Sequence, residues 1–206
     1  MFIYTFLVHN FPSASQAGVN PRRAASTSSP TTVRRAVRAD AGQILELVTQ
    51  YAEQGLMLLR TFEEVASRID NYVVATDSSG RVIACAALEE YSPSLAEVSS
   101  VAVATTHQGK GFGTQVVLGV ERLARARDID ELFALSLTDK FFLSLSYRAT
   151  TISRYPEKLA RYDTLSKSGV EIVPKRCFQK ELGKSWSAPQ LVEQSAAPKS
   201  KKRKIG

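Results

Sequence analysis

The segment from Val101 to Thr114, V-A-V-A-T-T-H-Q-G-K-G-F-G-T, carries residue types that can bind an anion. A strand pattern ends, three glycines follow at alternate positions, and a helical pattern begins at once. Glycine permits positive φ and lets the backbone approach a ligand, while the start of a helix presents unpaired N–H groups and a positive dipole end. Lys110 and the Thr114 hydroxyl can add donors. The segment therefore predicts a phosphate-binding loop.

Two other phosphate-binding motifs do not fit this loop. A kinase-type P-loop needs G-x-x-x-x-G-K followed by Ser or Thr, whereas Lys110 precedes Gly111 here. The dinucleotide fingerprint G-x-G-x-x-G requires a third glycine where Thr114 stands. A glycine turn that merely joins strand to helix stays open as an alternative, but it does not explain Gln108 together with three alternating glycines.

Hydrophobic periodicity places the loop within a mixed α/β order. Asp40 with Gln43 and Thr61 with Glu64 have the spacing of helix-capping boxes, and D-S-S-G at 77–80 favours a hairpin. We expect antiparallel strand pairs early in the chain and a strand-helix-strand unit late. The expected strands are 33–38, 72–76, 82–88, 97–103, 131–137 and 176–182, and the expected helices begin after Asp40 and Thr61 and cover 111–127 and 138–145.

Gln108, Gly111 and Gly113 match Q/R-x-x-G-x-G/A, the signature of the GNAT acetyltransferase superfamily, and the stretch 33–182 resembles the acetyltransferase domain of N-acetylglutamate synthases in a short, stand-alone form. Four segments carry this likeness: L-L-R-T-F-E-E, I-A-C-A-A-L, A-E-V-S-S-V-A-V and L-F-A-L-S-L-T-D-K-F-F. It implies an α/β fold, with a GNAT-like mixed, mostly antiparallel central sheet flanked by helices. It also implies acetyl-CoA as co-substrate, held by Val101, Val103, Gln108, Gly109, Lys110, Gly111, Phe112, Gly113 and Thr114.

Acetyl transfer to an amine needs an unprotonated nucleophile and a donor for the thioester oxygen. The resemblance assigns the base to Glu97 and a hydroxyl that orients the amine to Ser136, with Glu89 and Glu90 as alternative bases. Backbone N–H groups near Ser100 and Val101 would polarise the carbonyl. Many GNAT enzymes have a tyrosine acid where this chain has Phe142, so we expect the thiolate to leave unprotonated, and Tyr147 to be a packing residue.

The resemblance also implies an acidic amino acid, L-glutamate, as acceptor, and hence a role in arginine biosynthesis. Its carboxylates need cationic partners. Arg60 matches one family position, whereas the family's second arginine falls in V-P-K-R-C, where Lys175 or Arg176 could substitute. With Ser100 these are the predicted acceptor-binding residues. Cys177 is interpreted as buried packing. Another small amine, a protein N-terminus, or a non-catalytic acyl-CoA-binding module remain alternatives.

Composition narrows the function classes. The chain has 206 residues and a net charge of +7, but between Val33 and Gly183 there are 19 basic and 19 acidic residues. A formally neutral body argues against a nucleic-acid-binding domain. Two cysteines and two histidines cannot form the usual four-ligand Cys/His zinc site, and we expect no metal. The longest apolar stretch is far shorter than the roughly 20 residues of a membrane span.

The two ends differ in composition from the body. Residues 1–32 lack acidic residues and end in a Ser/Thr-rich run, which we interpret as a disordered leader or, alternatively, an organellar transit peptide. Residues 184–206 end in the basic run 199–204, a flexible tail or a nuclear or polyanion-binding signal. We expect one acetyltransferase domain at 33–183, a cytoplasmic location, a possible homodimer, and no nucleic-acid contact except through the tail.

Overall fold

The computed structural model describes residues 31–183, so both predicted tails lie outside the described residues apart from positions 31 and 32. One mixed sheet of seven strands forms the centre, in the order β1-β2-β3-β4-β5-β7-β6. Every neighbouring pair is antiparallel except β4 and β5, which are parallel. The strands are β1 (Thr32–Arg35), β2 (Tyr72–Thr76), β3 (Val82–Ser92), β4 (Leu95–Val103), β5 (Glu131–Ser136), β6 (Arg148–Thr150) and β7 (Arg176–Glu181).

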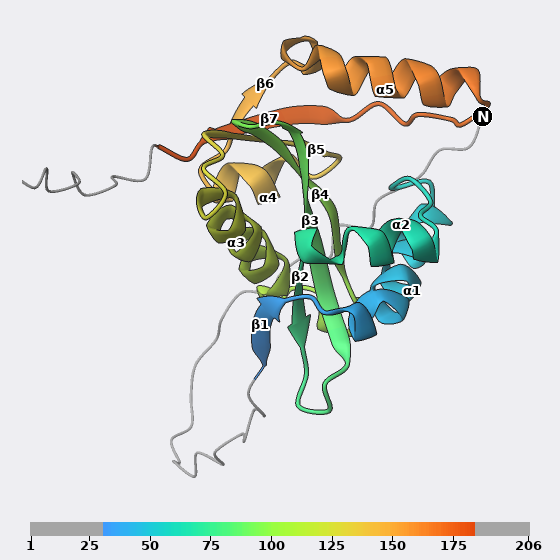
Figure 1. The fold of residues 1–206 in the computed structure, drawn as a ribbon, viewed down its shortest axis with the longest axis vertical. Helices are drawn as coiled ribbons and strands as arrows, with labels where there is room; N and C mark the ends of the chain where they lie inside the picture. The colour runs from blue at the N-terminus through green and yellow to red at the C-terminus, as the bar shows by residue number, and fades with distance from the viewer. Residues whose placement is uncertain (1–30, 184–206) are drawn as a thin grey trace, which may run out of the picture.

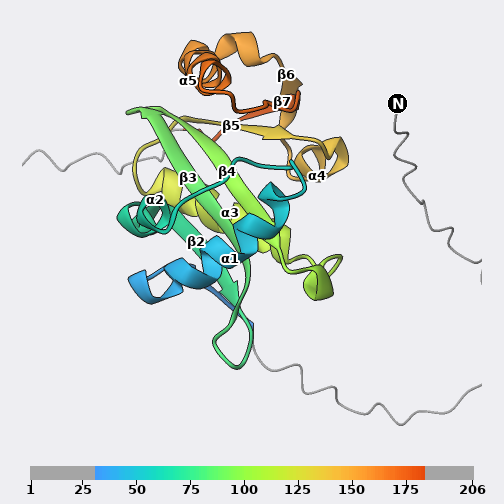
Figure 2. The same cartoon turned by 90° about the vertical axis from the view of Figure 1, so that its right-hand side faces the viewer.

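Helices cover both faces of this sheet. Figure 2 shows α1 and α2 on the near face and α3 behind the sheet, and in Figures 1 and 2 α5 lies alongside β7. The helices are α1 (Ala41–Ala52), α2 (Phe62–Ser67), α3 (Phe112–Arg125), α4 (Asp139–Ser144) and α5 (Pro156–Lys167). Alternate residues of β2 and β3 therefore belong to two separate cores, as the period of 2 along a strand requires.

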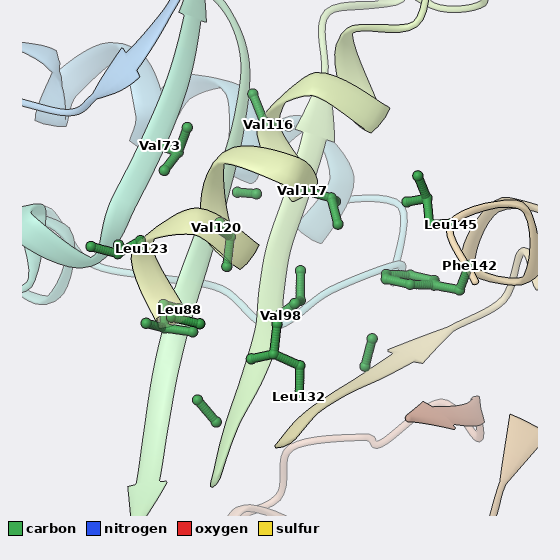
Figure 3. Close-up of a cluster of buried hydrophobic side chains, with 14 of the residues drawn as sticks. Val73, Leu88, Val98, Val116, Val117, Val120, Leu123, Leu132, Phe142 and Leu145 are labelled. Atoms are coloured by element: carbon green, nitrogen blue, oxygen red, sulfur yellow. The ribbon is translucent and has the colours of Figure 1, made fainter. Parts of the chain in front are cut away.

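The larger core lies under α3. Figure 3 shows Val116, Val117, Val120 and Leu123 of α3 facing the sheet, with Phe142 of α4 and Leu145, the residue after α4, at the edge of the cluster. Val116, Val117 and Val120 are 0% exposed, and the four α3 residues recur at the helical spacing read from the sequence. The second core joins α1 and α2 to the opposite face.

The two expected capping boxes had different outcomes. Thr61 caps α2: its hydroxyl accepts the Glu64 N–H at 3.2 Å, and the Glu64 carboxylate accepts the Thr61 N–H at 2.8 Å. Asp40 is the N-cap residue of α1 as expected, but its side chain makes no capping hydrogen bond, so the expected box with Gln43 does not form. Asp40 lies in a 3-10 turn and binds the Arg34 guanidinium at 2.7 Å, while the Gln43 side chain accepts the backbone N–H of Val82 at 2.9 Å. Both side chains therefore bind partners outside α1 instead of the N–H groups at its start.

Candidate active site

A groove of about 1290 Å³ opens where β4 and β5 diverge. The two parallel strands pair only at Leu95–Glu97 with Glu131–Phe133, although β4 continues to Val103 and β5 to Ser136. The groove is lined by the unpaired parts of both strands, the glycine loop, the segment before α2, α4 and α5. Its volume exceeds the roughly 300–1,000 Å³ of ordinary small-molecule sites, so a molecule as large as a coenzyme fits.

The glycine loop borders the groove as the sequence predicts. Gly109 and Gly111 have φ of 73° and 84°, in the left-handed region that favours glycine, and Gly111 is the N-cap residue of α3. The amides of the first turn of α3 have no partner within the helix, so they are free for phosphate oxygens. The groove is lined by Gln108, Gly109, Gly111, Phe112, Gly113 and Thr114. Lys110 is not among the lining residues; its ammonium donates to the Thr106 carbonyl at 2.9 Å.

Tyr51, from the last turn of α1, ties the end of β4 to this loop. Its hydroxyl donates to the Val103 carbonyl at 2.6 Å and accepts from the Val103 N–H at 3.3 Å. The Gln108 side-chain amide donates to the same hydroxyl at 2.8 Å. The signature glutamine thus positions the loop through Tyr51, and both backbone groups of Val103, a predicted cofactor-binding residue, are engaged by this tyrosine. Sequence analysis did not identify Tyr51.

β4 has a bulge in the middle of the groove. Cys85 of β3 pairs with Ala102 and Ala87 pairs with Ser99, so Ser100 and Val101 together face one residue. Ser100 has φ of 50°, which is uncommon for a residue other than glycine. Such bulges are typical of sites where a strand stops pairing and presents its backbone to a ligand. Ser100 and Val101 both line the groove, where their N–H groups were expected.

Glu97, the predicted base, lies in the groove lining and is 4% exposed. Its carboxylate accepts two contacts from the Lys158 ammonium, at 2.8 and 3.1 Å, and one from the Tyr91 hydroxyl at 2.9 Å. Burial and the neighbouring Glu97 charge raise the pKa of Tyr91, so this hydroxyl stays a donor. Glu97 is therefore held in place from two sides rather than free in solvent.

Lys158 is a site residue that sequence analysis missed. It is buried, its ammonium lies 4.7 Å from the centre of the Tyr162 ring, and both residues line the groove. They come from α5, a helix in the stretch 146–175 that the sequence reading left without an element. Pro156 at the first helical turn, with Leu159 and Tyr162 three and six residues later, was the available signal.

The other predicted catalytic residue, Ser136, ends β5 and also lines the groove. Its hydroxyl accepts the Thr138 N–H at 2.9 Å, which fixes the turn into α4. Phe142 lines the groove from α4 and is buried. Tyr147 packs edge-on against Phe142, with ring centres 5.1 Å apart, and does not line the groove, so it is a packing residue.

The predicted acceptor-binding cations separate into two groups. Arg60 and Lys175 both line the groove; Arg60 pairs with Glu89 at 3.6 Å, and Lys175 donates to the Leu56 carbonyl at 2.7 Å. Burial, followed by the charge of Lys158, lowers the pKa of Lys175, although Glu97 opposes this shift. Arg176 forms an ion pair with Asp139, is largely exposed and does not line the groove.

The two alternative bases are held in ion pairs away from the groove. Glu89 is 9% exposed and contacts Arg60, Arg68 and Arg161. Glu90 pairs with Arg127. Neither glutamate lines the groove, so Glu97 is the one carboxylate of the three that does.

Cys177 is 4% exposed, and burial raises its pKa to about 12, as expected for a packing residue. Within residues 31–183 no group of three or more His, Cys, Asp or Glu side chains could hold a metal ion. None of the helices in this part of the chain is long and apolar enough to cross a membrane.

Residues 42–140 match the model of the acetyltransferase (GNAT) family. An uncharacterized N-acetyltransferase of Chlorobaculum tepidum is 35% identical over 131 residues, which are 64% of this chain and 84% of that protein. The chain belongs to the GNAT acetyltransferase family. The predicted family and fold class are confirmed, and the chain is an N-acetyltransferase that uses acetyl-CoA.

More distant relatives include enzymes that act on amino acids. An amino-acid acetyltransferase of Mannheimia succiniciproducens is 30% identical over 145 residues, covering 69% of this chain and 33% of that protein. N-acetylglutamate synthase from Neisseria gonorrhoeae, solved with coenzyme A and N-acetyl-glutamate, has a TM-score of 0.65 at 24% identity, over 75% of this chain and 36% of that one. Rv2747 from Mycobacterium tuberculosis, solved with CoA, has a TM-score of 0.64 at 24% identity, over 73% of this chain and 98% of that one. This chain thus spans about a third of the length of the Mannheimia and Neisseria proteins.

Proposed function

We propose that this enzyme transfers the acetyl group of acetyl-CoA to the α-amino group of an acidic amino acid, with L-glutamate as acceptor. One observation carries the proposal: the groove is lined by four cationic side chains against two carboxylates, and these are Arg60, Lys140, Lys158 and Lys175 against Glu97 and Asp139. An acidic amino acid has two carboxylates and one ammonium group. The surplus of positive charge in the groove complements an acceptor with two carboxylates and disfavours a basic acceptor.

The cofactor end of the groove supplies donors for a diphosphate. The first-turn amides of α3 and the Thr114 hydroxyl lie at the rim, and Tyr51 fixes the loop that presents them. Acetyl-CoA, when bound, supplies a thioester, whose carbonyl carbon is open to attack by an amine. In this proposal the N–H groups of Ser100 and Val101, two groove-lining residues at the bulge, donate to the carbonyl oxygen.

Glu97 has two tasks in this proposal. Its negative charge attracts the acceptor's ammonium group, and it then takes the proton, directly or through a water molecule, so that the amine can attack. Lys158 and Tyr91 hold the carboxylate in one orientation, which reduces the reorganisation needed for proton transfer. The Ser136 hydroxyl, on the opposite wall, orients the amine. The thiolate leaves without a tyrosine acid, since Phe142 occupies the corresponding place.

The test is a panel of amino acids with acetyl-CoA, followed through thiol release. We expect release with glutamate, less with aspartate, and little with glutamine, norvaline or lysine, because only glutamate supplies both carboxylates at the right separation. Glu97→Gln should lower kcat by roughly 10²- to 10⁴-fold, the usual contribution of a general base.

Lys167→Gln provides a matched control, because Lys167 lies on α5 in an exposed pair with Asp163. It should leave the rate unchanged. Equal rates with glutamine and glutamate would overturn the acidic acceptor while retaining the acetyltransferase. Absence of release with every amine would favour an acyl-CoA-binding module.

A further inference from the structure

Charged side chains, rather than apolar packing, hold α5 against the sheet. None of its 12 side chains belongs to the hydrophobic clusters of residues 31–183. Lys158 is its one buried residue, and Arg161, Tyr162 and Leu165, which follow on the same face at helical spacing, are partly buried. The ion pairs that α5 makes with other elements in this part of the chain are those of Lys158 and Arg161.

The partners of these two cations lie directly opposite each other in the sheet. Glu89 of β3 is paired with Glu97 of β4 in the antiparallel register, so both carboxylates project from the same face. Lys158 and Arg161 are three residues apart, which places them side by side on α5. Lys158 binds Glu97 at 2.8 Å, and Arg161 binds Glu89. Two adjacent cations of the helix thus meet two adjacent anions of the sheet.

Both carboxylates are largely shielded from water. Glu89 is 9% exposed and Glu97 is 4% exposed. Ion pairs in such surroundings are screened less than pairs at the surface, and the loss of one partner leaves a charge with little hydration. The position of α5 on the sheet therefore depends on these two carboxylates.

Glu89 has two further cationic partners. Arg60 lies 3.6 Å from its Oε2 atom, and Arg68 donates to its Oε1 atom at 3.2 Å. Arg60 precedes α2 and Arg68 follows it, so neither belongs to α5. These two arginines can neutralise Glu89 without Arg161. What the Arg161 contact adds is the attachment of α5 to β3.

We propose that Glu89 and Arg161 are positioning residues for acetyl transfer. Their ion pair fixes α5 on β3 and so places the Lys158 ammonium against Glu97. Neither Glu89 nor Arg161 lines the groove, so they act through Lys158 and not on the acceptor itself. Because Lys158 and Arg161 are less than one helical turn apart, a shift of α5 at Arg161 also moves Lys158. The inference rests on the proposed role of Glu97 as base.

The experiment combines hydrogen exchange of the α5 amides with steady-state kinetics of the full-length chain. In Arg161→Gln we expect these amides to exchange about tenfold faster, because the helix has lost one of its two ties to the sheet. We also expect kcat to fall by about tenfold, since Glu97 is less well oriented for proton transfer. The KM for acetyl-CoA should not change, because α5 does not carry the glycine loop. Arg161→Lys keeps the charge and should lie between Arg161→Gln and the wild type in both measurements.

Arg68→Gln is the matched control. Arg68 contacts the same oxygen of Glu89 from the end of α2 and has no hydrogen bond or ion pair with α5. Its variant should keep the wild-type exchange of α5 and the wild-type kcat. In a Lys158→Met background, Arg161→Gln should lower kcat little further, because its effect passes through Lys158.

Unchanged α5 exchange in Arg161→Gln, or equal effects of Arg161→Gln and Arg68→Gln, would overturn the proposal. Faster α5 exchange with a wild-type kcat would also overturn it, as would an Arg161→Lys rate no higher than that of Arg161→Gln. The Arg161 side chain is 30% exposed, so its variants should fold. If Arg161→Gln does not fold, Glu89→Asp draws the carboxylate back from Arg161 and is tested by the same two measurements.

The two proposals fail in different ways. A wild-type chain that does not acetylate glutamate contradicts the proposed function, and the exchange of α5, which is measured without an acceptor, still shows whether Arg161 fixes the helix. A wild-type chain that acetylates glutamate, with an Arg161→Gln variant equal to it in kcat, contradicts the positioning role alone.

Discussion

Three glutamates of this chain show how the same side chain takes different roles in different surroundings. Glu97 lines the groove and is held by Lys158 and Tyr91, whereas Glu89 is surrounded by arginines and Glu90 pairs with Arg127 at the surface. A carboxylate acts as a base only where it can reach the acceptor amine. Of these three glutamates only Glu97 lines the groove, so it is the one to which we give the role of base in our proposal.

Tyr51→Phe removes the hydroxyl that joins α1, Val103 and Gln108. We expect the KM for acetyl-CoA to rise by about tenfold, with the KM for the acceptor nearly unchanged. Without the hydroxyl, the glycine loop loses the hydrogen bonds that hold it to α1 and to the end of β4. Steady-state kinetics measure both values. Gln108→Ala in the Tyr51→Phe background should add little, because the two side chains act as one unit.

The control for Tyr51 is Tyr155→Phe. That hydroxyl donates to Glu131 at 2.7 Å, outside the groove lining, so its loss should reduce stability without altering either KM. A Tyr51→Phe enzyme with an unchanged KM for acetyl-CoA would contradict the positioning role.

Lys175 should make acceptor binding sensitive to alkaline pH. Burial lowers the pKa of Lys175, so its positive charge is lost at a lower pH than the charge of an ordinary lysine. If its ammonium binds a carboxylate of the acceptor, the KM for glutamate rises over that range. Lys175→Arg keeps its charge to much higher pH, so its KM should stay flat.

The measurement is the KM for glutamate against pH for the wild type, Lys175→Arg and the α5 surface control Lys167→Arg. The control should follow the wild type, and titration of the substrate amine is common to all three. Parallel profiles for Lys175→Arg and the wild type would remove Lys175 from the acceptor site.

At the scale of elements, the close approach of α3 to the sheet depends on a residue without a side chain. A Cβ atom on Gly119 would lie 2.6 Å from Val73 Cγ1 of β2, well inside contact distance. Because α3 also carries the glycine loop at its N-terminus, its seating on the sheet positions the cofactor end of the groove.

Gly119→Ala should lower the free energy of unfolding by about 1–3 kcal/mol, since the overlap with Val73 outweighs the roughly 1 kcal/mol gain in helix propensity. Gly42→Ala, in α1 with no atom within 4 Å of the added Cβ, is the matched control and should be neutral or stabilising. Urea unfolding of both variants gives the comparison, and equal or greater stability of Gly119→Ala would show that α3 can shift at little cost.

At the scale of the whole molecule, both cysteines of the chain are buried, Cys85 in the core under α1 and α2 and Cys177 in a smaller cluster with Phe133 and Tyr155. Cys85 and Cys177 are 0% and 4% exposed, and burial raises the pKa of each thiol to about 12. A neutral, inaccessible thiol is a poor nucleophile, so neither should react in the native state.

We therefore expect no reaction of the native chain with a disulfide reagent at pH 8, and reaction of both thiols after unfolding in denaturant. Absorbance of the released chromophore measures this. The same result ensures that the thiol-release assay reports coenzyme A alone. Rapid labelling of the native chain would mean that the cluster around one of the two cysteines opens readily.

The sequence by itself determined the local features of this protein. The glycine loop, the Thr61 capping box, the strand at Tyr72–Thr76 and the core positions of α3 follow from spacing and from residue types with restricted conformations. The family signature likewise depends on residues close together in the chain, which is why the fold class and co-substrate were predictable.

Only the tertiary structure decided which charges meet. Lys158 pairs with Glu97 across 61 positions, Tyr51 reaches Val103 across 52, and Arg161 reaches Glu89 across 72. The Asp40 carboxylate binds Arg34 instead of capping α1, and Arg176, which does not line the groove, pairs with Asp139. Long side chains have many partners within reach, and the choice depends on burial and on neighbours that the packing of sheet and helices brings together.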